Sequence, residues 1–222
     1  AGINLSDSKR DMVYSRLVRR LRAHRFNSFD DYLQLLADGE SGERVHFINA
    51  LTTNLTSFFR ERHHFDYLTA TVLPLIEQRG DRRLRIWSAG CSTGEEPYSI
   101  AMTVADYLKG KPGWDIKIYA TDLDTNVVGV GKYGVYDADR VKGLSSAQLK
   151  HWFLRGKGRN QGMVRVKPEL QCLLEFRSLN LLHEWPYKEL FDVIFCRNVV
   201  IYFNKETQRR LFKRFSNLLY PS

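Results

Sequence analysis

The sequence has few cysteines and no long apolar run. Its three cysteines, Cys91, Cys172 and Cys196, lie far apart and form no CxxC pair, so neither a disulfide framework nor a zinc site is indicated. No stretch approaches the roughly 20 apolar residues that a membrane helix needs, and the first residues lack the apolar segment of a signal peptide. We therefore expect a soluble protein of a reducing cytoplasm, with no membrane insertion.

Acidic residues are outnumbered by basic ones. The 222 residues include 34 Lys and Arg against 25 Asp and Glu, a formal net charge of +9 with a pI near 9.5. This balance indicates an acidic partner, which nucleic acid or an acidic protein surface would satisfy equally. With 43% hydrophobic residues, the chain can bury one substantial core or two small ones, which excludes disordered, collagen-like and mini-protein classes.

The first part of the chain, residues 1–75, shows helical periodicity and few strand signals. Residues 9–25 form a predicted amphipathic helix with seven Lys or Arg against one acidic residue. A second helix is predicted over residues 28–36 with its end near Gly39, and one or two more within residues 47–68. We therefore expect an all-α domain over residues 1–75.

The second part, residues 76–222, alternates strand and helix signals. Two predicted strands lie at residues 84–88 and 116–122, and the segments 173–182 and 190–203 each predict a buried strand followed by a functional loop. The first two strands and the helix between them form a βαβ unit, so we expect a parallel sheet. Residues 133–172 interrupt the alternation and contain a glycine-rich hairpin at 155–166, which predicts a small insertion subdomain.

The loop after the first predicted strand has the composition of a ligand-binding turn. Residues 88–97 leave a strand and open a helix, which is where an open α/β sheet binds its ligand. Gly90 and Gly94 allow tight turning and close backbone approach, but the loop is not a P-loop and matches GxGxxG poorly. Glu95 and Glu96 at the helix start would repel a pyrophosphate and could hold a cation or hydroxyls. The expected ligand therefore carries a positive group.

An acidic residue follows at the end of the second predicted strand. Asp122 can accept hydrogen bonds from the 2′- and 3′-hydroxyls of a ribose, although Asp122 or Asp124 could instead cap the helix that begins near Thr125. Combined with the glycine loop, the ribose interpretation is favoured. A ribonucleoside with a cationic appendage and no phosphate describes S-adenosylmethionine.

Four segments in this order carry a family resemblance: TTNLTSFFRERHHF, AGCSTGEEPYSIAM, ATDLD and FCRNVVIYF. With them the chain resembles the CheR family of bacterial chemotaxis receptor glutamate O-methyltransferases over residues 9–221. The resemblance implies an α/β fold: a class I S-adenosylmethionine-dependent methyltransferase, Rossmann-like with a mostly parallel sheet, an all-α N-terminal domain and a small antiparallel β-subdomain. It implies methyl transfer from S-adenosylmethionine to receptor glutamates, giving methyl esters and S-adenosylhomocysteine for chemotactic adaptation.

The family pattern also implies more chain than is present. A class I sheet usually has seven strands, of which only four are visible here, with an expected order of third, second, first and fourth. We expect a further helix before residue 1 and further strands after residue 222, without which an apolar sheet edge is exposed.

The resemblance assigns the site residues by motif. The implied cofactor pocket contains Asn54, Thr56, Arg60, Glu96, Asp122, Asn180, Leu181, Arg197 and Asn198, and the glycine loop adds Gly90. Arg60 and Tyr202 are expected to be catalytic, since they can orient an acceptor carboxylate that is already a nucleophile at pH 7 and needs no base. Without the resemblance, pairing of Arg60 with Glu61 or Asp66, and a core position for Tyr202, would be the better explanations.

The family resemblance also implies a partner, and the sequence leaves two competing functions open. Receptor docking is expected at Arg16, Arg19, Arg20 and Arg22 of the basic helix, whose alternative is a plain solvated face. The implied partner is the cytoplasmic domain of a methyl-accepting chemotaxis receptor, with a C-terminal tether peptide possible at the 155–166 hairpin, and no nucleic acid. A non-catalytic S-adenosylmethionine-binding signalling scaffold and an RNA or small-molecule methyltransferase stay open as alternatives. No metal is expected, because the adjacent His63 and His64 point to different helix faces.

Overall fold

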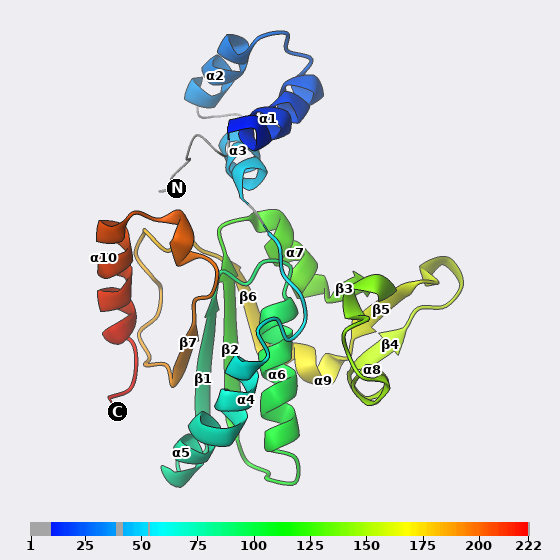
Figure 1. Ribbon diagram of the computed structural model, residues 1–222, viewed down its shortest axis with the longest axis vertical. Helices are drawn as coiled ribbons and strands as arrows, with labels where there is room; N and C mark the ends of the chain where they lie inside the picture. The colour runs from blue at the N-terminus through cyan, green and yellow to red at the C-terminus, as the bar shows by residue number, and fades with distance from the viewer. Residues whose placement is uncertain (1–9, 39–41, 53, 222) are drawn as a thin grey trace.

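The computed structural model describes residues 10–38, 42–52 and 54–221. A helical N-terminal part lies above an α/β part, and a small second sheet lies at the side of the latter (Figure 1). The helical part contains α1 (Arg10–His24), α2 (Phe29–Asp38) and α3 (Glu43–Leu51). The helices predicted at residues 9–25 and 28–36 correspond to α1 and α2, whereas Gly39 lies outside the described residues.

A buried carboxylate joins these three helices. Glu43, the first residue of α3, is 1% exposed. Its carboxylate accepts two hydrogen bonds from Arg20 of α1 at 2.8 and 2.7 Å and one from the Tyr32 hydroxyl of α2 at 2.7 Å, and it lies 2.8 Å from His24 Nε2. Because a buried charge is costly unless it is paired, this cluster fixes how the helices pack.

The main sheet is parallel, and its strand order β6-β2-β1-β7 confirms the predicted order. Its strands are β1 (Arg83–Ala89), β2 (Asp115–Asp122), β6 (Leu174–Ser178) and β7 (Val193–Phe195). The helices of this part are α4 (His63–Tyr67), the π-helix η2 (Leu68–Val72), α5 (Leu73–Gln78), α6 (Glu95–Tyr107), α7 (Thr125–Tyr133) and α10 (Lys205–Ser216), together with the 3₁₀ turn η5 (Val200–Tyr202).

Both faces of strand β1 are buried. Consecutive side chains of a strand point to opposite sides, and those of β1 pack in two different clusters. Leu84 and Ile86 pack in one cluster with residues of α4, α5 and α6. Trp87 packs in the other, with Leu211 and Phe215 of α10. The sheet is therefore covered by helices on both faces, which places the open positions for a ligand at the ends of its strands.

The segment predicted as an insertion forms the second sheet. Its strands β3 (Val135–Asp137), β5 (Met163–Val166) and β4 (Phe153–Arg155) are antiparallel in the order β3-β5-β4. Four short helical elements accompany them: η3 (Ala138–Val141), α8 (Ser146–Trp152), η4 (Gly158–Asn160) and α9 (Pro168–Gln171). Trp152, Val166 and Leu170 belong to the same buried cluster as Ile86 and Tyr98, so this sheet shares its core with the main one.

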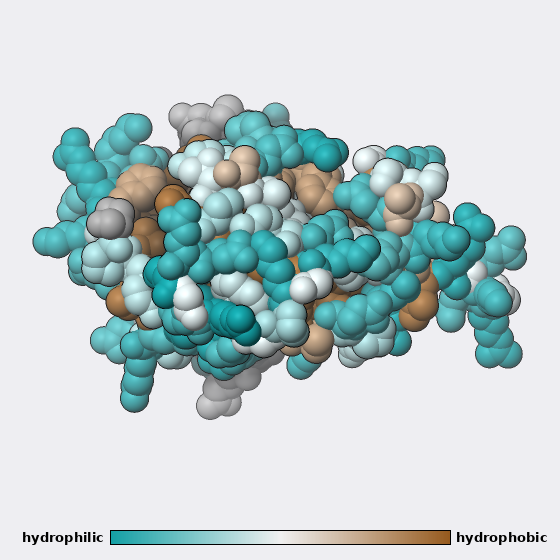
Figure 2. Space-filling model, turned by 90° about the horizontal axis from the view of Figure 1, so that it is seen from below, coloured by the Kyte–Doolittle hydropathy of each residue, from teal (hydrophilic) through white to brown (hydrophobic). Residues whose placement is uncertain are grey.

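The surface is largely polar. Seen from the end opposite the helical part, hydrophilic residues cover most of the molecule, and apolar ones are visible mainly in recesses between them (Figure 2). Among the described residues, no helix combines the length and the apolar character needed to cross a membrane.

Candidate cofactor and acceptor site

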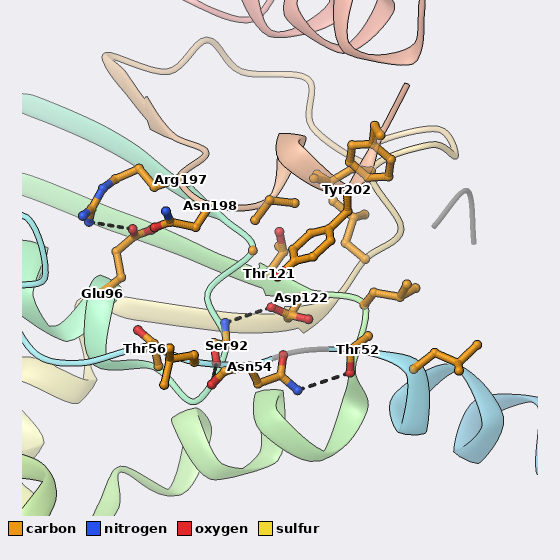
Figure 3. Close-up of a pocket in the computed structure, with 18 of the residues that line it drawn as sticks. Thr52, Asn54, Thr56, Ser92, Glu96, Thr121, Asp122, Arg197, Asn198 and Tyr202 are labelled. Atoms are coloured by element: carbon orange, nitrogen blue, oxygen red, sulfur yellow. Dashed lines mark hydrogen bonds and ion pairs between the residues drawn. The ribbon is translucent and has the colours of Figure 1, made fainter. Parts of the chain in front are cut away.

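One pocket lies between the carboxyl ends of the parallel strands and the helical part of the chain (Figure 3). All eleven residues that the sequence indicated for the cofactor and the acceptor line it: Asn54, Thr56, Arg60, Gly90, Glu96, Asp122, Asn180, Leu181, Arg197, Asn198 and Tyr202. The sequence missed several further lining residues, among them Met12, Leu51, Thr52, Ser92, Val199 and Phe203. Met12 and Leu51 come from α1 and α3, so the helical part supplies one wall of the pocket.

The loop after β1 is held closely against the rest of the site. The backbone N–H groups of Gly90 and Cys91 both donate to the Thr121 carbonyl, at 2.8 and 2.9 Å. Gly90 has a φ of +98°, and a Cβ atom there would lie 2.2 Å from Val199 Cγ2. Only glycine fits this position, because the chain is both left-handed and in contact with the segment that follows β7.

The two aspartates after β2 have different roles. Asp122 lines the pocket, and its carboxylate accepts hydrogen bonds from the backbone N–H groups of Ser92 at 2.8 Å and Asp124 at 3.0 Å. Burial raises the pKa of Asp122, and these backbone hydrogen bonds oppose the shift. Asp124 is the N-cap of α7, where it accepts from the Asn126 N–H at 2.9 Å. Of the two candidates for the cap, the structure selects Asp124 and leaves Asp122 for the pocket.

The N-cap aspartate also organises the segment that enters the pocket from the helical part. Asp124 Oδ2 accepts hydrogen bonds from Thr52 Oγ1 and Asn54 Nδ2, each at 2.8 Å. The Asn54 carbonyl accepts from Ser92 Oγ at 3.2 Å. Asn54 thus lines the pocket while its amide group is anchored to α7, which links the helical part to the loops of the sheet.

The two glutamates at the start of α6 point in different directions. Glu96 lines the pocket and accepts hydrogen bonds from Ser88 Oγ at 2.7 Å and Arg197 Nη1 at 3.0 Å. Burial raises the pKa of Glu96, and the bonds from Ser88 and Arg197 oppose the shift. Glu95 is fully buried elsewhere, where it accepts from Thr93 Oγ1 at 2.6 Å and from Arg140. The expectation that both carboxylates face the ligand is therefore wrong for Glu95, since adjacent helical residues project about 100° apart.

Arg197 connects the segment after β7 to the turn that precedes α4. Its Nη1 donates to Glu96, and its Nη2 donates to the Arg60 carbonyl and lies 3.2 Å from Glu61 Oε2. The hydrogen bond from Arg197 lowers the pKa of Glu61. Within the described part of the chain, Arg197 Nε is buried without a hydrogen-bond partner.

The two residues expected to be catalytic lie at the pocket. Arg60 Nη1 donates to the Leu55 carbonyl at 2.8 Å, and Arg60 Nε lies 3.8 Å from Glu61 Oε1. Asp66, the other suggested partner of Arg60, pairs instead with Arg62 at 3.7 Å. Tyr202 is only partly buried, at the end of η5, and lines the pocket rather than the core (Figure 3).

Strained backbone surrounds Arg60. Phe59 and Glu61, on either side of it, have φ values of 52° and 54°, a left-handed conformation that non-glycine residues rarely adopt. Asn198 on the facing segment has a φ of 58°, which asparagine tolerates better than most residues. Such conformations persist where surrounding contacts hold them, and here the Arg197 contacts to Arg60 and Glu61 do so.

The loop after β6 completes the pocket with Asn180 and Leu181. Asn180 Oδ1 accepts from the Leu182 N–H at 2.9 Å, and the Leu181 carbonyl accepts from Trp185 Nε1 at 3.1 Å and Arg214 Nη1 at 2.8 Å. The loop is therefore tied both to itself and to α10, so these lining residues are held in place before any ligand arrives.

The four arginines proposed for docking are not equivalent. Arg16 donates to the carbonyls of Ala50, at 3.3 Å, and Thr52, and Arg20 is bound to Glu43. Arg19 and Arg22 are exposed on α1. The sequence pattern could not distinguish these pairs, because the partners of Arg16 and Arg20 lie more than 20 positions away in the chain.

Neither metal ligation nor thiol chemistry is suggested at the pocket. No group of three or more His, Cys, Asp or Glu side chains suited to a metal occurs in the described ranges. Burial raises the pKa of the Cys91 thiol and that of Cys196, the latter to about 12, so both stay protonated at neutral pH.

Comparison with protein families gives two matches that together cover almost the whole chain. Residues 1–52 match the family model described as "CheR methyltransferase, all-alpha domain". Residues 54–222 match "CheR methyltransferase, SAM binding domain", where SAM is S-adenosylmethionine. The boundary between the two models falls at the segment through which Thr52 and Asn54 reach Asp124.

Several similar proteins align with this chain over most of their own length. A "Chemotaxis protein methyltransferase" of Salmonella typhimurium is 51% identical over 100% of this chain and 75% of its own length. "Chemotaxis protein methyltransferase 2" of Pseudomonas aeruginosa is 50% identical over 99% of this chain and 78% of its own length. A "Probable chemotaxis protein methyltransferase" of Rhizobium etli is 41% identical over 99% of this chain and 83% of its own length.

Proposed function

Because the chain belongs to the CheR methyltransferase family, we propose that it transfers a methyl group from S-adenosylmethionine to the side-chain carboxylate of glutamates on chemoreceptors. The observation that carries this proposal is the pocket itself, which combines two partly buried carboxylates, Glu96 and Asp122, with Arg60 and Tyr202. The carboxylates suit a cationic nucleoside, whereas the arginine and the phenol suit an anionic acceptor.

The residues present fit S-adenosylmethionine. Asp122 offers carboxylate oxygens to a ribose at the end of β2. Glu96 lines the same pocket, with its carboxylate paired to Arg197. Gly90 keeps the backbone of the loop free of a side chain that would enter the pocket wall.

The reaction places little chemical demand on the protein. When bound, S-adenosylmethionine supplies a methyl group on a positively charged sulfur, so its transfer to a carboxylate breaks one C–S bond, forms one C–O bond and neutralises both charges without moving a proton. Arg60 would orient the acceptor carboxylate and offset its charge, and the Tyr202 hydroxyl would donate to the same group. Positioning, rather than a general base, would provide the rate enhancement.

We place the partner in the cytoplasm, as the cytoplasmic domain of a methyl-accepting chemotaxis receptor. The exposed Arg19 and Arg22 of α1 would contact an acidic face of that domain, and the hairpin of β4 and β5 is a candidate for binding a receptor tether peptide. Arg16 and Arg20 would support this surface from within. The division into residues 1–75 and 76–222, with a subdomain at 133–172, remains part of the proposal.

The direct test is methyl transfer to a receptor. The chain would be incubated with methyl-labelled S-adenosylmethionine and membranes that carry a chemoreceptor, and the labelled receptor treated with mild alkali. Glutamate methyl esters release volatile labelled methanol, whereas N-methyl groups and RNA methyl groups do not. Alkali-labile label on the receptor supports the proposal. Binding of S-adenosylhomocysteine without any transfer contradicts it and favours a signalling scaffold.

A further inference from the structure

The turn that carries Tyr202 is short. Two backbone hydrogen bonds close η5, from the N–H groups of Tyr202 and Phe203 to the carbonyls three residues earlier, each at 3.1 Å. Hydrogen bonds of a 3₁₀ turn have poorer geometry than those of an α-helix, so such a turn holds itself together weakly. Its middle residue, Ile201, is 68% exposed and does not anchor it in the core. Contacts from outside the turn must therefore help to fix Tyr202.

Gln208 of α10 supplies such contacts. Its side-chain Nε2 donates to the carbonyls of Val200 and Phe203, each at 2.9 Å. These carbonyls belong to the first residue of η5 and to the residue that follows the turn, so the two bonds enclose Tyr202 in the chain. A glutamine amide nitrogen carries two hydrogens, and both are accounted for by this turn. Gln208 is partly buried, which limits the competition of water for these bonds.

The helix that carries Gln208 is itself fixed to the main sheet. Leu211 and Phe215 of α10 are 1% and 6% exposed, and they belong to the same buried cluster as Trp87 of β1. A side chain on a packed helix is held more precisely than one on a loop. Gln208 therefore transmits the position of the sheet to the turn that carries Tyr202.

Capping of α10 does not explain the Gln208 side chain. The first turn of a helix presents backbone N–H groups, so a cap must supply an acceptor. Asn204 supplies one, because its side chain accepts from the Thr207 N–H at 2.9 Å. Gln208 Nε2 can only donate, and it donates to carbonyls of the preceding turn. Its bonds therefore stabilise η5 rather than the end of α10.

We propose that Gln208 is a positioning residue that holds the Tyr202 hydroxyl in place for the acceptor carboxylate. Tyr202 and Phe203 both line the pocket, so a shift of the turn moves the pocket wall on which the acceptor would be bound. A displacement of about 1 Å in a group that orients a substrate can lower a rate about 100-fold. This inference rests on the proposed function, because it assumes that Tyr202 contacts a protein glutamate.

The test combines two substitutions with a matched control. The variants are Gln208→Leu, which keeps a side chain of similar size but removes both donors, Tyr202→Phe, and the two together. The control is Gln78→Leu, since Gln78 is exposed at the end of α5 and lies outside the pocket residues. Methylation at saturating receptor gives kcat, and calorimetry gives the Kd for S-adenosylhomocysteine. We expect Gln208→Leu to lower kcat about tenfold and to change the Kd less than about threefold, with both unchanged in Gln78→Leu.

The double variant separates positioning from a general loss of structure. If Gln208 acts through the Tyr202 hydroxyl, Gln208→Leu should lower kcat less than about twofold once Tyr202→Phe has removed that hydroxyl. An equal loss of kcat in both backgrounds overturns the inference. So does a native kcat in Gln208→Leu, or a loss of S-adenosylhomocysteine binding as large as the loss of kcat.

Nuclear magnetic resonance of the chain alone keeps the inference distinct from the proposed function. With ¹³C-labelled tyrosine, the ring signal of Tyr202 is identified by its loss in Tyr202→Phe. We expect Gln208→Leu to shift or broaden this signal, and Gln78→Leu to leave it in place. An unchanged signal in Gln208→Leu overturns the inference. If the native chain binds S-adenosylhomocysteine but methylates no receptor, the proposed function fails, even where the signal shows that Gln208 holds Tyr202.

Discussion

At the scale of single residues, neighbouring side chains of the same type do different work. Asp122 and Asp124 are two positions apart, yet one lines the pocket and the other caps α7 and anchors Thr52 and Asn54. The sequence identified Asp122 as a ligand residue but left the cap undecided between them. The cap itself is the bond from the Asn126 N–H to Asp124. The further bonds to Asp124 from Thr52 and Asn54, 72 and 70 positions away, are contained in no local pattern.

This division predicts opposite effects for the same substitution. Asp122→Asn should weaken binding of S-adenosylhomocysteine at least tenfold, because an amide accepts less strongly from ribose hydroxyls, while the melting temperature changes little. Asp124→Asn should lower the free energy of unfolding by about 1–2 kcal/mol through the weakened helix cap. Calorimetry and thermal unfolding of both variants check this. Equal effects of the two substitutions on binding would contradict the assignment of Asp122 to the ligand and of Asp124 to the helix cap.

Arg60 should affect transfer more than binding. Arg60→Ala is expected to lower kcat for receptor methylation about 100-fold or more, because the acceptor carboxylate loses its oriented donor, while the Kd for S-adenosylhomocysteine changes less than fivefold. The control is Arg62→Ala, whose side chain is 73% exposed, pairs with Asp66 and lies over the Phe59 ring. Methyl transfer by Arg60→Ala at the native rate would remove Arg60 from the mechanism.

At the scale of elements, the strands of the main sheet were predictable and several contacts of the helices were not. Short apolar strands between loops and helices indicate a parallel sheet, and the family resemblance implied its strand order. The basic pattern of α1 instead suggested a uniformly exposed face. It could not show that Arg20 is bound to Glu43 of α3, since a buried ion pair between helices depends on how they pack.

The Glu43 cluster makes the stability of the helical part depend on pH. Burial alone would raise the pKa of Glu43, but the hydrogen bonds from Arg20, Tyr32 and His24 outweigh it and lower the pKa from 4.5 to about 2. A carboxyl whose pKa is lower in the folded state stabilises the fold above its unfolded value. That contribution is therefore present above about pH 4.5 and is lost as the pH falls toward 2.

Substitution of Glu43 should reproduce that loss at neutral pH. Glu43→Gln is expected to reduce the free energy of unfolding of the helical part by about 3 kcal/mol at pH 7, because Arg20 keeps its charge without a partner. The difference from the native chain should shrink below pH 4. Denaturant unfolding, followed by far-UV circular dichroism at pH 7 and below pH 4, measures this difference in the free energy of unfolding. The control is Asp38→Asn on the exposed end of α2. A pH-independent difference would contradict the cluster's role.

At the scale of the whole molecule, the pocket depends on parts of the chain that do not line it. Glu95 joins α6 to η3 of the small sheet through Arg140, and the Tyr136 hydroxyl donates to the Thr93 carbonyl at 2.8 Å. Thr93 belongs to the loop that also contains Ser92 and Gly90. The small sheet therefore supports the cofactor loop from outside the pocket.

Removing this support should weaken the pocket at a distance. Arg140→Ala leaves the buried Glu95 carboxylate without its cation, so we expect a loss of about 3 kcal/mol in stability and weaker binding of S-adenosylhomocysteine by about fivefold. Adding Glu95→Gln to Arg140→Ala should recover part of the stability, because the unpaired charge is removed. Lys142→Ala, at a 74% exposed side chain, is the control. Additive losses in the double variant would show that Arg140 and Glu95 act independently.

Because the two sheets share one core, the small sheet cannot unfold independently of the main sheet. Trp152, Val166 and Leu170 are packed in one cluster with Ile86 and Tyr98. Detaching the small sheet would expose those side chains of the main domain to water, so the two sheets should unfold in a single cooperative step. The inserted region is therefore not an independent folding unit. Deletion of residues 133–172 would unfold the methyltransferase domain, because it would remove part of that domain's core.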